Sequence, residues 1–219
     1  MRIDLHTHTL LSDGDLLPIE LARRADVKGI KGIAFTDHVS LSTIDRVIEE
    51  TAKDCQLAES WDIETVLGVE ITHVPANRID DLVSRARRLG AELVVVHGES
   101  LAEPTEPGTN LMAVKNPEVD ILAHPGLITI EEAQLAKDNS ITLEISSRRG
   151  HCLTNGHVAL RALEVGAGMV VNTDAHSYSD LITQERAELV AKGAGLSENE
   201  VKRAVIDNPQ EILRRIRGR

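Results

Sequence analysis

The chain of 219 residues carries a formal net charge of −11, and its aromatic side chains are confined to Phe35, Trp61 and Tyr178. The length fits one domain, residues 1–219, because single α/β barrels reach this size, and the composition predicts an aliphatic core. The acidic balance argues against an extended nucleic-acid surface and against binding to an anionic membrane.

Short apolar runs alternate with helical patterns along the chain, which is typical of repeated βα units. Seven strands are expected, at residues 3–6, 32–36, 65–71, 93–97, 121–123, 141–145 and 169–172. Helices are expected at 18–28, 43–60, 77–89, 131–137, 154–165 and 180–191, and a last helix runs from Ser197 to the C-terminus with an interruption near Pro209. The proline-containing segment 98–110 is the one long loop expected, and it is a candidate lid.

The sequence predicts a soluble cytoplasmic protein. Cys55 and Cys152 lack the spacing of a disulfide framework or a cysteine zinc site, which favours a reduced compartment. The first expected strand starts so close to Met1 that no signal peptide is expected, and no apolar run reaches the roughly 18 residues of a membrane span. Nothing in the sequence indicates the oligomeric state.

Two histidines stand close together at the first expected strand. Side chains alternate along a strand, so His6 and His8 point the same way and are able to chelate one ion. With nine histidines in the chain, a pair of this kind arises by chance fairly often, so its meaning depends on the other strands.

Every expected strand is followed by ionisable side chains. In a parallel βα barrel the C-terminal ends of the strands meet at one mouth, so these groups are expected to converge there. The candidate metal ligands among them are His6, His8, Asp13, His38, Glu70, His97, His124, Asp174 and His176. One ion rarely needs more than four protein ligands, so this set predicts two or three divalent ions, and its mixed imidazole and carboxylate chemistry accepts Zn, Mn or Fe.

Further polar residues stand near the same edge. Arg148 and Arg149 follow the sixth strand, where an adjacent pair of guanidinium groups is a candidate for binding substrate phosphate. Asp4 and Asp37 are better explained as hydrogen-bond acceptors behind the ligands than as ligands. The sequence leaves open the roles of His73 and His151.

These strand-end motifs resemble those of the PHP family (polymerase and histidinol phosphatase). The resemblance spans residues 1 to about 180 and includes D-L-H-T-H-T at 4–9, S-D-G at 12–14, T-D-H at 36–38, G-V-E at 68–70, His97, A-H-P-G at 123–126 and N-T-D-A-H at 172–176. It implies a distorted (β/α)7 TIM-like barrel that binds up to three divalent ions and hydrolyses phosphoesters. The implied ligands are His6, His8, Glu70 and Asp174 for the first ion, Glu70 as a bridge to a second held by His97 and His124, and Asp13, His38 and His176 around a third.

We therefore expect a phosphatase for a small phosphomonoester, most similar to histidinol phosphate phosphatase. A metal-activated hydroxide would attack phosphorus at a centre that includes Glu70 and Asp174, while Arg148 neutralises developing charge. A nuclease or nucleotide phosphoesterase of the same family is the first alternative, although so few aromatics offer little stacking surface. A non-catalytic metal-binding regulatory domain is disfavoured by the intact ligand set, and an amidohydrolase by the absence of a lysine beside Glu70 or His97.

Overall fold

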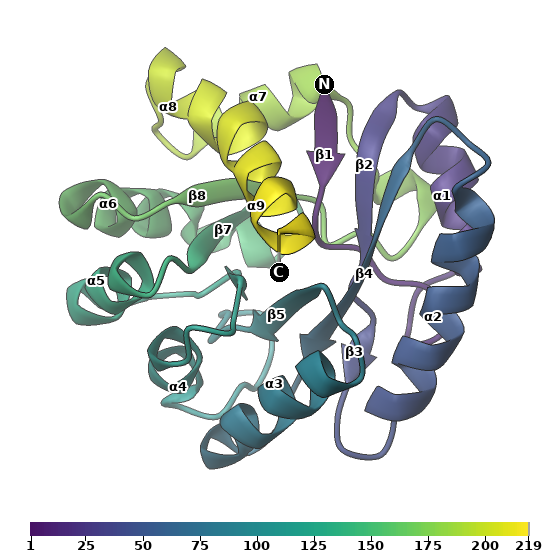
Figure 1. The fold of residues 1–219 in the computed structure, drawn as a ribbon. Helices are drawn as coiled ribbons and strands as arrows, with labels where there is room; N and C mark the ends of the chain where they lie inside the picture. Colours follow the sequence, from purple (N-terminus) through teal and green to yellow (C-terminus); the bar gives the residue numbers. More distant parts are fainter. Residues whose placement is uncertain (219) are drawn as a thin grey trace.

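Parallel strands form the centre of the computed structural model, which describes residues 1–218 (Figure 1). In sheet order the strands are β1 (Arg2–Asp4), β2 (Ile30–Phe35), β4 (Glu64–Ile71), β5 (Leu93–His97), β6 (Ile121–Ala123), β7 (Thr142–Ser146) and β8 (Met169–Asn172). All neighbouring pairs are parallel. The seven expected strands and the distorted (β/α)7 barrel are thus confirmed.

One short strand does not follow from the sequence. β3 (His38–Val39) begins three residues after the end of β2 and pairs with β4 at Glu70 and Ile71. Two residues carry no alternating pattern, so such a strand has no signal in the sequence. Its pairing places His38 directly beside Glu70 at the end of the barrel.

The sheet closes between β8 and β1 only near the C-terminal ends of the strands. There Thr7 and Ala175 form an isolated bridge, and the backbone N–H of Asp174 donates to the carbonyl of His6 at 2.9 Å. Below this bridge the Asp4 carboxylate accepts from the N–H and the hydroxyl of Thr173, as expected for a supporting acceptor. The closure brings the ends of the first and last strands together.

Helices surround the strands (Figure 1). They are α1 (Pro18–Val27), α2 (Ile44–Ala58), α3 (Ile79–Arg88), α4 (Thr109–Lys115), α5 (Ile130–Asp138), α6 (Asn155–Val165), α7 (Gln184–Gly193), α8 (Glu198–Lys202) and α9 (Asn208–Arg217), with single 3₁₀ turns at Ala76–Arg78, His151–Thr154 and Tyr178–Asp180. The expected capping box opens α8 at Ser197, and the expected interruption is a π-helical turn, Arg203–Asp207, just before Pro209. No helix among residues 1–218 is long and apolar enough to cross a membrane.

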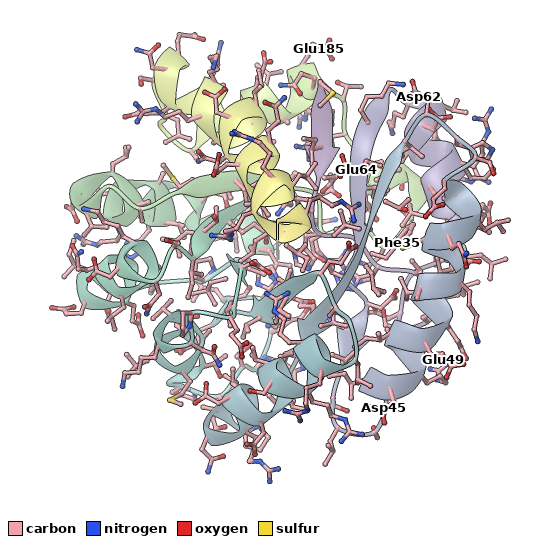
Figure 2. All side chains as sticks on the ribbon, in the orientation of Figure 1. Phe35, Asp45, Glu49, Asp62, Glu64 and Glu185 are labelled. Atoms are coloured by element: carbon pink, nitrogen blue, oxygen red, sulfur yellow. The ribbon has the colours of Figure 1, made fainter. Side chains whose placement is uncertain are left out.

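The interior of the barrel is aliphatic and is closed at one end by α9. Figure 1 shows this helix, in yellow, lying across the middle of the ring of strands. Its apolar side chains pack with those of the strands in one buried cluster, to which α9 contributes Ile212, Leu213 and Ile216. Phe35 is also fully buried, whereas Asp45, Glu49 and Asp62 lie on the outside of the molecule (Figure 2). The other end of the barrel, where the strands finish, carries the polar residues.

Candidate metal centre

The nine candidate ligands all lie at the C-terminal ends of the strands and form four overlapping groups. Within each group one nitrogen or oxygen atom of every residue lies within 4.8 Å of the others. The groups are His8, Asp13, His38 and His176; His6, His124 and Asp174; His6, His8 and Glu70; and Glu70, His97 and His124. The structure therefore brings together every candidate ligand named from the sequence.

His6 and His8 are buried and point toward the same position. Their Nε2 atoms are 3.1 Å apart, and they lie 3.4 and 3.5 Å from Glu70 Oε2. Asp174 Oδ1 lies 3.1 Å from His8 Nε2 on another side. This is the arrangement expected of an H-x-H pair that chelates with two carboxylates.

Glu70 lies between two of the groups. Its Oε2 faces His6 and His8, while its Oε1 lies 3.6 Å from His124 Nε2. The side chain is fully buried, and neither oxygen accepts a hydrogen bond from any residue in the range 1–218. His38 Nδ1 is 2.7 Å from Oε2, but this nitrogen is directed at the Thr72 hydroxyl, also 2.7 Å away.

A buried carboxylate without hydrogen bonds is costly unless a cation neutralises it. Burial alone would raise the pKa of Glu70, but the charges of His6 and His38 outweigh this effect and lower the pKa well below its ordinary value. Burial raises the pKa of Asp174 to about 7, and the negative charges of Glu70 and Glu144 add to this effect. The charge of His6 opposes it. The unpaired oxygens and crowded carboxylates fit divalent ions.

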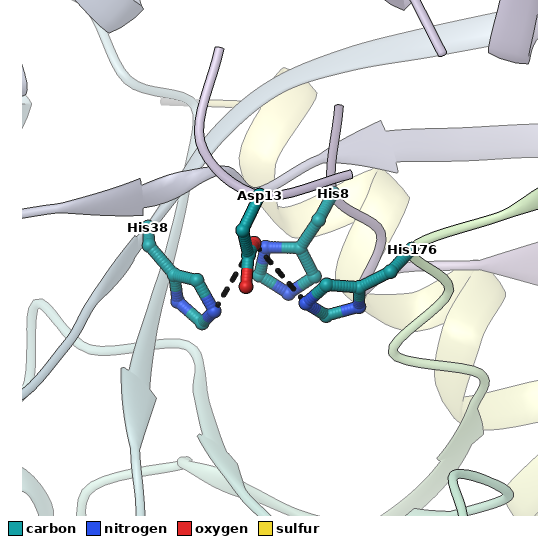
Figure 3. Close-up of side chains that lie close together, drawn as sticks. All are labelled: His8, Asp13, His38 and His176. Carbon is teal, nitrogen blue, oxygen red and sulfur yellow. Dashed lines mark ion pairs between the residues drawn. The ribbon is translucent and has the colours of Figure 1, made fainter. Parts of the chain in front are cut away.

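The group around Asp13 lies nearer to solvent, since the side chains of Asp13 and His38 are 56% and 24% exposed. Figure 3 shows how its four side chains lie together. Asp13 Oδ1 is 3.2 Å from His176 Nε2 and 3.6 Å from His38 Nε2, and the rings of His38 and His176 each lie 4.2 Å from that of His8. Asp13 is carried by a tight turn, in which the N–H of Gly14 donates to the Thr9 carbonyl at 2.8 Å. A Cβ atom on Gly14 would lie 2.5 Å from the carbonyl oxygen of His8, so only glycine fits there.

Two further carboxylates support the ligands. Asp37 accepts from the N–H and hydroxyl of Thr9 and from the hydroxyl of Ser12, and so fixes the segment that carries Asp13. Glu144 Oε1 lies 2.8 Å from His6 Nδ1, and its Oε2 accepts from the N–H of His124. A proton on His6 Nδ1 leaves Nε2 as the lone-pair atom that faces the centre. The sequence shows Glu144 at a strand end but does not predict this role.

Two of the candidate ligands have strained backbones. His124 and Asp174 adopt φ values of 28° and 52°, in a region that residues other than glycine rarely occupy. Such strain concentrates at functional sites, because the surrounding structure must hold it in place. Here the His124 N–H is bonded to Glu144 and the Asp174 N–H to the His6 carbonyl.

The predicted phosphate-binding arginines lie at the rim of the centre. Arg148 Nη1 donates to the Asp174 carbonyl at 3.0 Å and lies 2.6 Å from His176 Nδ1. Arg149 is exposed and forms no ion pair with residues 1–218. Both line a cavity of about 670 Å³ next to His176, together with Arg186 of α7, which the sequence gives no reason to select.

Residues 4–183 match the PHP domain family, and these residues carry all nine candidate ligands. This chain belongs to the PHP family. The expected enzyme class, a metal-dependent phosphoesterase, is thereby confirmed.

Relatives of this PHP protein carry different names. An uncharacterised protein of Methanocaldococcus jannaschii is 48% identical over 219 residues, which cover 99% of this chain and 100% of that protein. A probable phosphatase of Thermoanaerobacter sp. is 31% identical over 231 residues, with 97% and 94% covered. A ribonuclease P protein component 3 of Methanosarcina barkeri is 24% identical over 220 residues, with 94% and 86% covered.

Solved structures share the fold of this PHP protein. An archaeal ribonuclease P with mature tRNA contains a chain that aligns with a TM-score of 0.70 at 18% identity, covering 97% of this chain and 89% of that one. Histidinol phosphate phosphatase from Lactococcus lactis, in complex with zinc, L-histidinol and phosphate, aligns with a TM-score of 0.63 at 16% identity, covering 90% and 94%. At these identities the likeness shows the fold alone.

Proposed function

We propose that this PHP protein hydrolyses a small phosphomonoester, of the kind that histidinol phosphate represents, at a centre of two or three divalent ions. The observation that carries the proposal is the fully buried Glu70, whose unpaired oxygens face two different groups of ligand atoms. The similarity to a probable phosphatase along almost the whole chain supports the same reaction class.

Each group of side chains has a place in this proposal. The first ion would be held by His6, His8, Glu70 and Asp174, the second by Glu70, His97 and His124, and the third by Asp13, His38 and His176. Bound divalent ions supply a nucleophile at neutral pH and neutralise the charge of the phosphoryl group.

The arginines would bind the substrate. Arg148 Nη1 donates a hydrogen bond to the Asp174 carbonyl. Its Nη2 has no partner among residues 1–218 and is able to donate to a phosphoryl oxygen. Arg149 and Arg186 line the adjacent cavity, whose volume of about 670 Å³ suits the body of a small metabolite. These side chains would orient the ester and offset charge that develops in the transition state.

A polynucleotide is the second candidate substrate, because the chain is also similar to ribonuclease P components. The net charge of −11 opposes it. Tyr178 is the one large exposed aromatic among residues 1–218, and Arg24 and Lys28 already lie over its ring. A stacking surface for several bases is therefore missing from the described part of the chain.

A substrate panel tests the proposal. Metal-loaded protein would be assayed with histidinol phosphate, mononucleotides, p-nitrophenyl phosphate and a single-stranded oligonucleotide. We expect turnover of small monoesters, abolished by Glu70→Gln and kept by the control Glu64→Gln, which changes the exposed far end of the same strand. Cleavage of the oligonucleotide alone would favour the second candidate, and no turnover of any substrate would favour a non-catalytic domain.

A further inference from the structure

The loop between β5 and α4, residues 98–108, is fixed at both ends. Glu99 Oε1 accepts from the N–H groups of Gly108 and Asn110, both at 2.9 Å, and the Asn110 side chain bonds the N–H of Glu99 and the carbonyl of Pro125. These bonds tie the loop to the segment after β6. The loop therefore holds its remaining side chains at a defined place on the mouth.

One of those side chains, Glu103, meets three histidines from three different strand ends. Its Oε2 lies 3.1 Å from His97 Nε2 and 3.3 Å from His73 Nε2, and its Oε1 lies 3.3 Å from His151 Nε2. His73 follows β4, His97 ends β5, and His151 follows β7. The sequence assigns no role to Glu103, because nothing in a loop pattern indicates which strand ends the loop will reach.

The second ion has three protein donors in the nine-residue arrangement, Glu70, His97 and His124. Catalytic ions keep a position for water or substrate and can take a fifth ligand, so there is room for one further side chain. His97 belongs both to this group and to a group formed with His73 and Glu103. Its Nδ1 is directed at the carbonyl of Gly98 and the hydroxyl of Thr105, so Nε2 is the atom that faces the ion.

A nitrogen that binds an ion cannot also donate a hydrogen bond. When His97 Nε2 binds its ion it carries no proton, so it has nothing to donate to the Glu103 oxygen 3.1 Å away. That oxygen would then face a lone pair, unless Glu103 binds the same ion. Two ligand atoms at about 2.0–2.1 Å from a tetrahedral ion lie roughly 3.3 Å apart, which is close to the observed separation. Glu103 is therefore positioned as a ligand of that ion.

We propose that Glu103 is an additional metal ligand, which the 98–108 loop delivers to the ion at His97, and that His73 and His151 hold its carboxylate in place. The inference rests on the proposed metal centre and extends it beyond the strand ends. Its consequence is that the loop helps to hold the second ion while a position on that ion stays open to water or substrate.

The test measures the retention of metal in the whole protein. Loaded wild type, Glu103→Gln and Glu103→Ala would be dialysed against graded EDTA, and the remaining metal counted by mass spectrometry. Glu106→Gln is the matched control, because Glu106 stands on the same loop and its carboxylate accepts from the N–H of Ala76 instead of facing a histidine. Visible spectra of the cobalt-substituted proteins would report the change in ligand set independently of activity.

We expect one ion of the Glu103 variants to be released at about 10–100-fold lower EDTA than in wild type and in Glu106→Gln, with the other ions unaffected. Identical release curves and cobalt spectra for wild type and both Glu103 variants overturn the inference while the metal centre stands. Loss of every ion together with the circular dichroism signal of the helices also overturns it, since Glu103 would then act only on folding. Fewer than two ions in wild type overturns the metal centre itself.

Discussion

Glu144 offers a test of how the centre is organised, because it touches two ligands without being placed among them. Its Oε1 lies 2.8 Å from His6 Nδ1 and accepts from the Asn172 amide at 2.9 Å, and its Oε2 accepts from the His124 N–H at 3.1 Å. Glu144→Gln keeps the volume of the side chain but turns one of the two oxygens into a donor. Whichever way the amide is oriented, at least one donor of the native set loses its acceptor.

The expected cost is large for a residue that binds no ion. A hydrogen bond to a charged group contributes about 1.5–3 kcal/mol, and loss of the partner that orients a metal-binding histidine commonly weakens metal affinity about 10–100-fold. We therefore expect Glu144→Gln to bind the ion at His6 about 10–100-fold more weakly, or about 1.4–2.7 kcal/mol.

The metal-free protein should respond differently. In the metal-free protein, removal of the Glu144 charge relieves its repulsion of Asp174 but also removes its attraction for His6, so the two effects partly offset each other. Isothermal titration with Zn²⁺ or Mn²⁺ measures the metal affinity. Thermal melting with and without EDTA measures the stability of the metal-free and loaded forms, and Glu64→Gln is the control. An unchanged affinity in Glu144→Gln, or equal destabilisation of the loaded and metal-free forms, would refute the reasoning.

Three other outcomes follow from the same contacts. Arg148→Ala should lower kcat/KM by about 10–150-fold, which corresponds to about 1.5–3 kcal/mol, and steady-state kinetics that match wild type would pass the phosphate-binding role to Arg149. Leu213→Ala should lower the free energy of unfolding in urea by about 2–5 kcal/mol, because it removes part of the apolar face of α9 that packs inside the barrel. Substitution of the exposed Arg214 by Ala is the control, and equal unfolding midpoints for the two variants would contradict this packing. Removal of the ions with EDTA should lower the Tm by about 5–11 °C for an ion present at 100 times its Kd, since that ion contributes about 2.7 kcal/mol, and a constant Tm in calorimetry would argue against metal binding.

Periodic features of the sequence account for much of the fold. Buried parallel strands leave uninterrupted apolar runs such as 93–97, and the strand-end rule for barrels was enough to name all nine side chains that the structure brings together. α4 is not predicted, because it has seven residues and starts after Gly108, which has a φ of 94° and offers no capping side chain.

Roles that depend on tertiary contacts do not follow from the sequence. Glu103 acts from a loop, Arg186 comes from a helix, and His151 lies in a 3₁₀ turn after β7. No local pattern shows that such segments lie at the mouth. Glu144 was visible at its strand end, but only the structure shows that it faces His6 and not an ion position.

The most direct test of the central claim is anomalous diffraction at the metal absorption edge, from crystals of the loaded protein. The account predicts at least two peaks on either side of Glu70, each about 2.0–2.2 Å from one of its oxygens, with His6 and His8 at the first and His97 and His124 at the second. No peak, or peaks that do not touch Glu70, would contradict it.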